Sequence, residues 1–351
     1  MTNAWSRPIL PPGVLMALPT DVWKDVMTEW LLLRDVCRLD SAVCAKMWRT
    51  EWLRMLLVER MEFLREAKFV GSNKLCTTRK YAAVGVPAMN WILKKGLCLA
   101  SLRIYGFLDY IDMENEICNA IKSLVDQGRL KQLEMIELNC CSLIGGRQFR
   151  SYILFDEVLL RMAKDCENLL YLDVSLCSRL EDGVIRKVVE SCKKLRYVNL
   201  SRTSITDATV VSLCDHCPLL ESLYILECNC LSEAAFMSLA SSNLRLTSIG
   251  LKVIANRFHP LEKVVNKFCA LKVIEVHGFS NSNLIMFGKH CLTNHLEVLD
   301  LRGCHDVTPE GLGVFGFDIT SDKLTVRLPA FLNLFAVIFI RECFPSVVWE
   351  V

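Results

Sequence analysis

The residues best suited to chemistry in this chain are its 18 cysteines and 6 histidines. Cys228 and Cys230, and the adjacent Cys140 and Cys141, could offer thiolates to zinc, but a structural zinc site needs four ligands that converge. Three histidines within 277–295 lie near one another without the nucleophile that covalent catalysis requires. The chain also contains no P-loop, no G-x-G-x-x-G that opens a helix after a strand, no H-E-x-x-H and no G-x-S-x-G. These patterns predict no enzymatic activity, no cofactor and no metal site.

The elements that would position such residues follow a repeated leucine frame. Residues 169–177 read L-x-x-L-x-L-x-x-C, and the leucine that opens this frame recurs at 169, 195, 220, 246, 271 and 296. The same frame begins at Leu99 and Leu133, at longer intervals. Its alternating apolar positions predict one short strand in each repeat, and the apolar residues at helical spacing between strands, as in 182–192, predict one helix. One such repeat cannot bury its own apolar face, so the repeats must stack into a solenoid.

Many of the cysteines occupy equivalent places in successive repeats. Those at 166, 192, 217 and 269 precede a strand, and those at 141, 177, 228 and 304 follow one. A small apolar side chain suits both places, so we expect buried free thiols that pack as small hydrophobes. Residues 1–12 lack the apolar segment of a secretory signal. The lack of this segment and the expected free thiols together predict a reducing compartment, which is the cytoplasm, with the nucleus as a second possibility.

Charge and hydropathy limit the classes of partner. The net charge is +2, from 41 basic and 39 acidic residues, so no strong field attracts nucleic acid or an anionic membrane. The most apolar segment, 328–340, is interrupted by Pro329 and Asn333 and is shorter than the ~20 residues of a transmembrane helix. We expect this segment to form a cap that closes the end of the solenoid, with a tail at the membrane interface as the alternative.

Before the repeats, residues 14–67 carry tryptophans and aliphatic residues at helical spacing and predict a small helical unit. Leu18-Pro19, Asp35-Val36, Val43-Cys44 and Trp48 stand in the order of the F-box pattern. That pattern opens with Leu-Pro, continues through an Asp-Leu pair and closes on Val-Cys before an aromatic residue. The Asp, the Val-Cys pair and the tryptophan sit a residue or two later here than is usual.

With its cysteine-containing repeats over 99–315, the chain resembles the F-box/leucine-rich-repeat family. The resemblance implies an α/β leucine-rich-repeat horseshoe after an all-α F-box-like unit at 14–67. Residues 68–98 would be a linker and capping helix, and 316–351 a C-terminal cap or tail. The implied function is that of a non-enzymatic substrate-recognition subunit of an SCF-type E3 ubiquitin ligase. Its partners would be a Skp-type adaptor, a cullin and an unknown target protein.

The resemblance also implies which residues bind the adaptor, and one alternative to it stays open. The implied adaptor-binding residues are Leu18, Pro19, Val22, Val26, Val36, Leu39 and Val43. The alternative is a leucine-rich-repeat interaction scaffold without a ubiquitin role, in which residues 18–67 are only a helical cap that shields the first repeat.

The third, fifth and seventh positions of the frame face the open side of the strand layer. The fifth-position row leans acidic, with Glu275 and Asp300 among its members. Tyrosines in the same rows are amphipathic rings of the kind that anchors protein interfaces, although tyrosine also simply suits a pleated surface. We predict a target site, for a segment with some basic character, at Glu137, Tyr171, Asp173, Tyr197, Asn199 and Tyr224.

Overall fold

The computed structural model describes residues 94, 101–105, 111–131, 133–139, 152–253, 259–291, 295–316, 324–332 and 334–350. The F-box-like domain predicted at 14–67, with all its proposed adaptor-binding residues, lies outside the described residues. So does the predicted linker at 68–98, except for Lys94. The chain forms two units, Met1–Arg103 with Phe107–Met135, and Ile104–Gly106 with Ile136–Val351.

The described part of the first unit consists of helix α6 (Ile111–Asp126) and the start of strand β1 (Ser101–Tyr105). Ile121 and Leu124 of this helix are fully buried. After α6 the chain adopts a left-handed conformation at Gly128 (φ 67°), and the N–H of Arg129 donates to the carbonyl of Leu124. Glycine has no Cβ to oppose this conformation, so the helix can end here with its carbonyls satisfied.

The strands run in chain order through one ten-stranded sheet. After β1 they are β2 (Met135–Asn139), β3 (Tyr171–Asp173), β4 (Tyr197–Asn199), β5 (Ser222–Tyr224), β6 (Ser248–Lys252), β7 (Val273–His277), β8 (Val298–Gly303), β9 (Thr325–Arg327) and β10 (Val348–Glu350). From β3 to β10 each strand pairs in parallel with the next. Equivalent frame positions therefore lie side by side in rows across the sheet.

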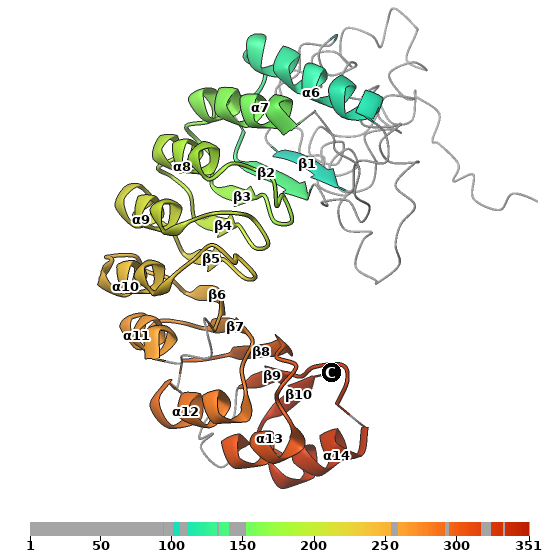
Figure 1. The fold of residues 1–351 in the computed structure, drawn as a ribbon, viewed down its shortest axis with the longest axis vertical. Helices are drawn as coiled ribbons and strands as arrows, with labels where there is room; N and C mark the ends of the chain where they lie inside the picture. The colour runs from blue at the N-terminus through green and yellow to red at the C-terminus, as the bar shows by residue number, and fades with distance from the viewer. Residues whose placement is uncertain are drawn as a thin grey trace, which may run out of the picture. The chain divides into compact units, whose positions relative to one another are not determined.

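One helix separates each pair of successive strands of the second unit. These are α7 (Tyr152–Asp165), α8 (Asp182–Ser191), α9 (Asp207–His216), α10 (Glu233–Ser241), α11 (His259–Lys267), α12 (Asn281–Cys291), α13 (Pro309–Gly316) and α14 (Leu334–Cys343). Each helix contacts the next one along the chain. Within this unit the helices form the outer layer and the strands the inner layer (Figure 1). The structure therefore has the leucine-rich-repeat architecture that the frame predicted.

The core lies between these two layers and is built from the frame residues. In the repeat at 169 the side chains of Leu169, Leu172 and Val174 are all buried, and the next repeats bury the equivalent residues. Residues between them on the strand are partly exposed, as in the alternating burial of β4 and β5. Because each repeat buries its leucines against its neighbours, stability depends on stacking rather than on any single repeat.

The repeat architecture continues past the boundary predicted at residue 315. Strand β9 pairs in register with β8, so Val326 lies beside Leu299 and Leu328 follows at the place of Leu301, and both are buried. Leu324 is also buried, but it stands opposite Glu297 rather than opposite the frame leucine Leu296. Strand β10 then pairs with β9, with helix α14 between them. The apolar segment 328–340 is thus divided between the exit of β9 and helix α14. No helix in the described part of the chain combines the length and the apolar character needed to cross a membrane.

Side chains at the helix starts connect neighbouring repeats. Asp182 accepts hydrogen bonds from the Thr206 N–H (2.6 Å) and the Thr209 hydroxyl (2.7 Å) of the next repeat. One repeat later, Asp207 accepts from the N–H of Ser232 at 2.8 Å. Thr206 and Ser232 are also the N-caps of α9 and α10. Thr206 and Ser232 therefore cap their own helices through their side chains and link them to the previous repeat through their backbone N–H groups.

The cysteines with described side chains are free thiols. Cys177, Cys228 and Cys304 lie in the turns after strands, and each donates its Sγ–H to a carbonyl of the preceding repeat, at Leu138 (3.1 Å), Leu200 (3.0 Å) and Val276 (3.1 Å). Cys192 is also buried, and desolvation raises its pKa to about 12. These thiols pack as neutral, small side chains, as the sequence predicted.

Cys269 is the exception, because it is exposed although we expected it to be buried. Cys166, Cys192 and Cys217 each precede the first frame leucine by three residues, whereas Cys269 precedes Leu271 by two. Phe268 takes the equivalent buried place, and the residue after it faces solvent. The expectation failed because a shift of one residue in a tight turn reverses the direction of the side chain. Cys141 lies outside the described residues.

Candidate interaction surface

The inner face of the sheet presents the polar frame positions in continuous rows. One row runs through Tyr171, Tyr197, Ser222 and Ser248, which are direct neighbours on β3 to β6. The parallel row runs through Asp173, Asn199, Tyr224, Gly250, Glu275, Asp300 and Arg327. Helices cover the opposite face in this unit (Figure 1), so these rows are where the strands can meet another molecule.

The three predicted tyrosines form one cluster on β3, β4 and β5. The rings of Tyr171 and Tyr197 stack with centroids 4.1 Å apart and planes 2° from parallel. Tyr224 leans against Tyr197 with centroids 5.6 Å apart. The stacking of Tyr171 on Tyr197 follows from the ~4.8 Å distance between strands, which brings rings that are in register into contact. Tyr224 is a diagonal neighbour of Tyr197, since Ser222 is the residue opposite Tyr197. Burial, and next to it the neighbouring Tyr171, raise the pKa of Tyr197, so its phenol stays uncharged.

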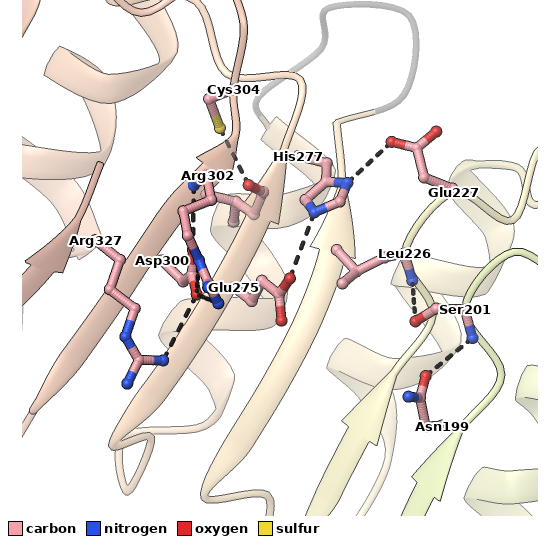
Figure 2. Close-up of polar contacts among 11 residues, drawn as sticks. Asn199, Ser201, Leu226, Glu227, Glu275, His277, Asp300, Arg302, Cys304 and Arg327 are labelled. Atoms are coloured by element: carbon pink, nitrogen blue, oxygen red, sulfur yellow. Dashed lines mark hydrogen bonds and ion pairs between the residues drawn. The ribbon is translucent and has the colours of Figure 1, made fainter. Parts of the chain in front are cut away.

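Asp173 and Asn199 stand in the same row as Tyr224 and shape the turns that leave β3 and β4. Asp173 is only 5% exposed, and its carboxylate accepts from the Ser175 N–H (2.9 Å) and the Asn199 amide (3.0 Å). Asn199 in turn accepts from the N–H of Ser201 at 3.1 Å, as Figure 2 shows. A carboxylate so buried and so engaged holds its neighbours in position and offers little surface to a partner.

Tyr224 occupies space that a missing side chain leaves open. Gly250, its neighbour on β6, is buried, and a Cβ at this position would lie 2.5 Å from Cδ1 of Tyr224. The ring therefore rests against the backbone of the next strand. Gly303 likewise leaves space for the imidazole of His277, because a Cβ at Gly303 would lie 2.1 Å from that ring. At both places a glycine on one strand leaves room for a ring on the neighbouring strand and so limits the orientation of that ring.

Charged side chains dominate the next part of the face, from the turn after β5 to β7. Glu227 accepts from Lys252 (2.6 Å) and contacts Nδ1 of His277 at 3.0 Å, while Nε2 of His277 lies 3.4 Å from Glu275. Glu227 adopts a left-handed conformation (φ 54°), as do Leu176 and Arg202 at the equivalent turns. The imidazole is therefore held between two carboxylates from different repeats (Figure 2).

The pKa values of this group reflect the contacts. The hydrogen bond to Glu275 and, more weakly, that to Glu227 raise the pKa of His277, against burial, which lowers it. Partial burial alone would raise the pKa of Glu227, but hydrogen bonds from Lys252 and His277 hold it below its ordinary value. Both shifts favour the charged forms, so the three side chains act as one ion-paired group.

A second charged group spans β8 to β10. Asp300 is 2% exposed, and its carboxylate accepts from the guanidinium of Arg302 at 2.6 and 3.0 Å and from the Arg302 N–H at 3.1 Å. Arg327 lies 3.6 Å from Asp300 and donates to Glu350 at 3.1 Å. Glu275 and Asp300 of the acidic row are therefore each paired with basic side chains of the same face, whereas Asp173 accepts from the uncharged donors of Ser175 and Asn199. Each carboxylate of this group is already engaged by a guanidinium within the protein.

The structure thus gathers five of the six predicted target-site residues on β3 to β5, namely Tyr171, Asp173, Tyr197, Asn199 and Tyr224. Glu137 occupies the fifth frame position on β2 and is partly exposed. The sequence reasoning missed Glu227, Lys252, His277, Arg302 and Arg327. The sequence signal for three of them is the seventh frame position, which holds Lys252, His277 and Arg302 beside the acidic fifth row.

The described cysteines and histidines offer no alternative centre. Cys228 is buried with its thiol on the carbonyl of Leu200, whereas Cys230 is exposed. In the described part of the chain no three side chains of His, Cys, Asp or Glu are grouped so that they could hold a metal ion.

Comparison with known proteins points to the repeats. A family model described as Leucine Rich repeat matches residues 294–316, which include β8 and α13. BTB/POZ domain-containing protein FBL11 from Arabidopsis thaliana is 26% identical over 167 residues, 43% of this chain and 17% of that protein. Antagonist of mitotic exit network protein 1 from Eremothecium gossypii is 30% identical over 131 residues, 35% of this chain and 33% of that protein. The chain thus spans a third or less of the length of these curated relatives.

Two solved structures resemble the chain at low identity. The complex of Rad7 and Elc1 in yeast gives a TM-score of 0.42 at 12% identity, covering 90% of this chain and 92% of that chain. The leucine-rich-repeat-containing protein LegL7 from Legionella pneumophila gives a TM-score of 0.44 at 13% identity, covering 76% of this chain and 86% of that chain.

Proposed function

Since the chain folds as a leucine-rich-repeat solenoid, we propose that it is the substrate-recognition subunit of an SCF-type E3 ubiquitin ligase. In this proposal the inner face of the sheet binds a target protein, and the F-box-like segment at 14–67 binds a Skp-type adaptor and, through it, a cullin. The protein performs no bond chemistry itself. It raises the effective concentration of target lysines near a ubiquitin-charged enzyme, in the reducing cytoplasm or nucleus.

The observation that carries the binding role is the ordered surface on β3 to β5. Tyr171, Tyr197 and Tyr224 are partly exposed, Tyr197 contacts both other rings, and Tyr224 packs against Gly250. Rings that are already ordered lose little conformational entropy when a partner covers them. A rigid parallel sheet that presents aromatic side chains is suited to binding a protein.

The ubiquitin role rests on a separate observation, the F-box resemblance at 18–56 in the same chain as the repeats. Apolar contact would supply most of the affinity for the adaptor. The proposed contacts are Leu18, Pro19, Val22, Val26, Val36, Leu39 and Val43. If they serve only a helical cap, the protein is an interaction scaffold without a ubiquitin role.

Co-purification of a tagged full-length chain with a Skp-type adaptor and cullin tests this proposal. The parent chain should retain both proteins, and the double variant Leu18→Ala/Pro19→Ala should lose them because two apolar contacts are removed. The matched control is Tyr197→Ala, which should retain the adaptor fully. Absence of adaptor from the parent chain, or full retention by the Leu18/Pro19 variant, would show that the F-box assignment is wrong.

A further inference from the structure

The inner face of the sheet is divided into two parts of different character. On β3 to β6 the partly exposed side chains Tyr171, Tyr197, Asn199, Ser222, Tyr224 and Ser248 carry no formal charge, and we call them the hydroxyl patch. From Lys252 and Glu227 onward the same face is charged. The boundary lies at Gly250, against which Tyr224 rests.

Most charged side chains next to the hydroxyl patch are already paired. The exposed Arg202, in the turn after β4, takes part in no ion pair among the described residues, and its positive charge would not attract a basic segment. Lys252 and His277 engage Glu227, and Arg302 and Arg327 engage Asp300. At the beginning of the strands, Arg196 pairs with Glu221. A partner that used one of these carboxylates would first have to displace a charge from within the protein and desolvate the pair. Charge complementarity therefore does not favour a basic segment, although the acidic row suggested one.

The buried carboxylate of Asp173, next to Asn199 of the patch, also does not favour a basic segment. Asp173 is 5% exposed and accepts hydrogen bonds from Ser175 and Asn199. Its role is to orient Asn199, which holds the turn at Ser201. The surface that a partner meets above it is therefore formed by phenol, hydroxyl and amide groups.

The combination of tyrosine, serine, asparagine and glycine on this face is typical of protein-binding surfaces. Tyrosine, serine, asparagine and glycine dominate antibody binding loops, because tyrosine offers a large amphipathic area at low entropic cost and the small residues offer adaptable hydrogen bonds. In the hydroxyl patch the tyrosines are also ordered before a partner binds. Tyr171 stacks on Tyr197, and Tyr224 packs against Gly250. Such a surface favours partners that contribute apolar and neutral hydrogen-bonding groups.

We propose that the hydroxyl patch binds an uncharged segment of a partner protein, and that this binding depends little on salt. The proposal deepens the proposed function, since it names the chemistry of the target segment, and it does not depend on the adaptor. The patch crosses four strands, which at ~4.8 Å between strands span about 14 Å. An extended segment of about four residues covers that distance.

Selection from a displayed library of random peptides, on the immobilised full-length chain, tests the proposal. Selection and binding are carried out at about 0.05 M and about 0.5 M NaCl, between which the screening of charges differs strongly. Selected peptides should show no enrichment in Lys or Arg over the starting library. Their dissociation constants should change less than about threefold between the two salt concentrations.

Variants locate the bound peptides on the face. Tyr197→Ala/Tyr224→Ala should weaken binding at least about tenfold, because two ordered rings are lost from the centre of the patch. Tyr171→Phe/Tyr197→Phe/Tyr224→Phe keeps the rings and should weaken binding several-fold through the lost hydroxyls, which guards against a general loss of fold. The matched control, Glu275→Gln/Arg327→Gln, changes the charged part and should leave binding unchanged.

Three results would overturn the proposal. They are selected peptides rich in Lys or Arg whose binding is lost at high salt, peptides unaffected by both tyrosine variants, and no selected peptide at all. Adaptor co-purification is measured on the same preparations. If the chain retains the adaptor but gives any of these three results, only the proposal for the hydroxyl patch is refuted. If the chain selects peptides whose binding does not depend on salt but does not retain the adaptor, only the ubiquitin role is refuted.

Discussion

The contact between Tyr224 and Gly250 leads to a sharp prediction for Gly250→Ala. The added methyl carbon would lie 2.5 Å from Cδ1 of Tyr224 and 3.3 Å from Cδ1 of Leu226, closer than ordinary van der Waals contact. If the ring stays, overpacking costs about 1–3 kcal/mol. If it swings away, it loses its contact with Tyr197, which is worth about 0.5–1.5 kcal/mol.

An opposing effect reduces this cost but does not remove it. Alanine restricts the unfolded chain and so stabilises by about 0.4–1 kcal/mol where the backbone conformation is compatible. We therefore expect Gly250→Ala to lower the free energy of unfolding by about 1 kcal/mol. Gly183→Ala is the matched control, because nothing lies within 4 Å of its Cβ and the residue is on helix α8. It should be neutral or stabilising by a few tenths of a kcal/mol.

Urea unfolding of the two single variants, of Tyr224→Ala and of the double variant Gly250→Ala/Tyr224→Ala measures the coupling. Once the ring of Tyr224 has been removed, the methyl group has space, so Gly250→Ala should then cost much less than in the parent chain. Equal costs in both backgrounds, or a Gly250→Ala variant as stable as Gly183→Ala, would refute the idea that this glycine positions the tyrosine.

Two further predictions follow from the charged group and from the cysteines. The pKa of His277 is raised above its ordinary value of 6.5, so the stability that the imidazolium contributes is fully present below about pH 6.5 and is lost as the pH rises through the higher value of the folded state. His277→Gln should therefore be most destabilising at low pH, and a difference from the parent that stays constant across pH 5.5–8.5 in urea unfolding would contradict this assignment. Cys217→Ala should cost about 1–2 kcal/mol because it leaves a cavity at a fully buried site, whereas Cys269→Ala at the exposed site should stay within about 0.5 kcal/mol. Equal midpoints of urea unfolding for the two cysteine variants would show that the buried position has been wrongly assigned.

The repeat architecture could be predicted because its information is local and periodic. Leu169, Leu172 and Val174 alternate within a few residues, and the frame returns after nearly constant intervals, so the strands must stack in register. Beyond the expected limit of the repeats at 315, the repeat that contains β9 departs from the leucine frame, because Leu324 precedes Val326 by two residues instead of three. The exposure of Cys269 also follows from spacing in the sequence, since it precedes its frame leucine by two residues and Cys217 by three.

The candidate site could be predicted in part for the same reason. Rows of frame positions bring Tyr171, Tyr197 and Tyr224 to adjacent strands, so their cluster follows from the sequence together with the spacing of a parallel sheet. The packing of Tyr224 against Gly250 and the stacking of Tyr171 on Tyr197 do not follow from it, because they depend on the direction that each ring takes.

The sequence by itself determined the solenoid, the face on which the polar rows lie and the buried places of most cysteines, because all three depend only on residue type and interval. Only the tertiary structure decided which charges meet. His277 reaches Glu227, 50 residues away in the chain, through a left-handed turn at that glutamate, and Asp300 is enclosed by arginines of its own and the next strand. Such pairs depend on the side-chain conformations that can span the ~4.8 Å between strands. A list of residues does not contain those conformations, so only the fold shows that Glu275 and Asp300 of the acidic row are paired with basic side chains.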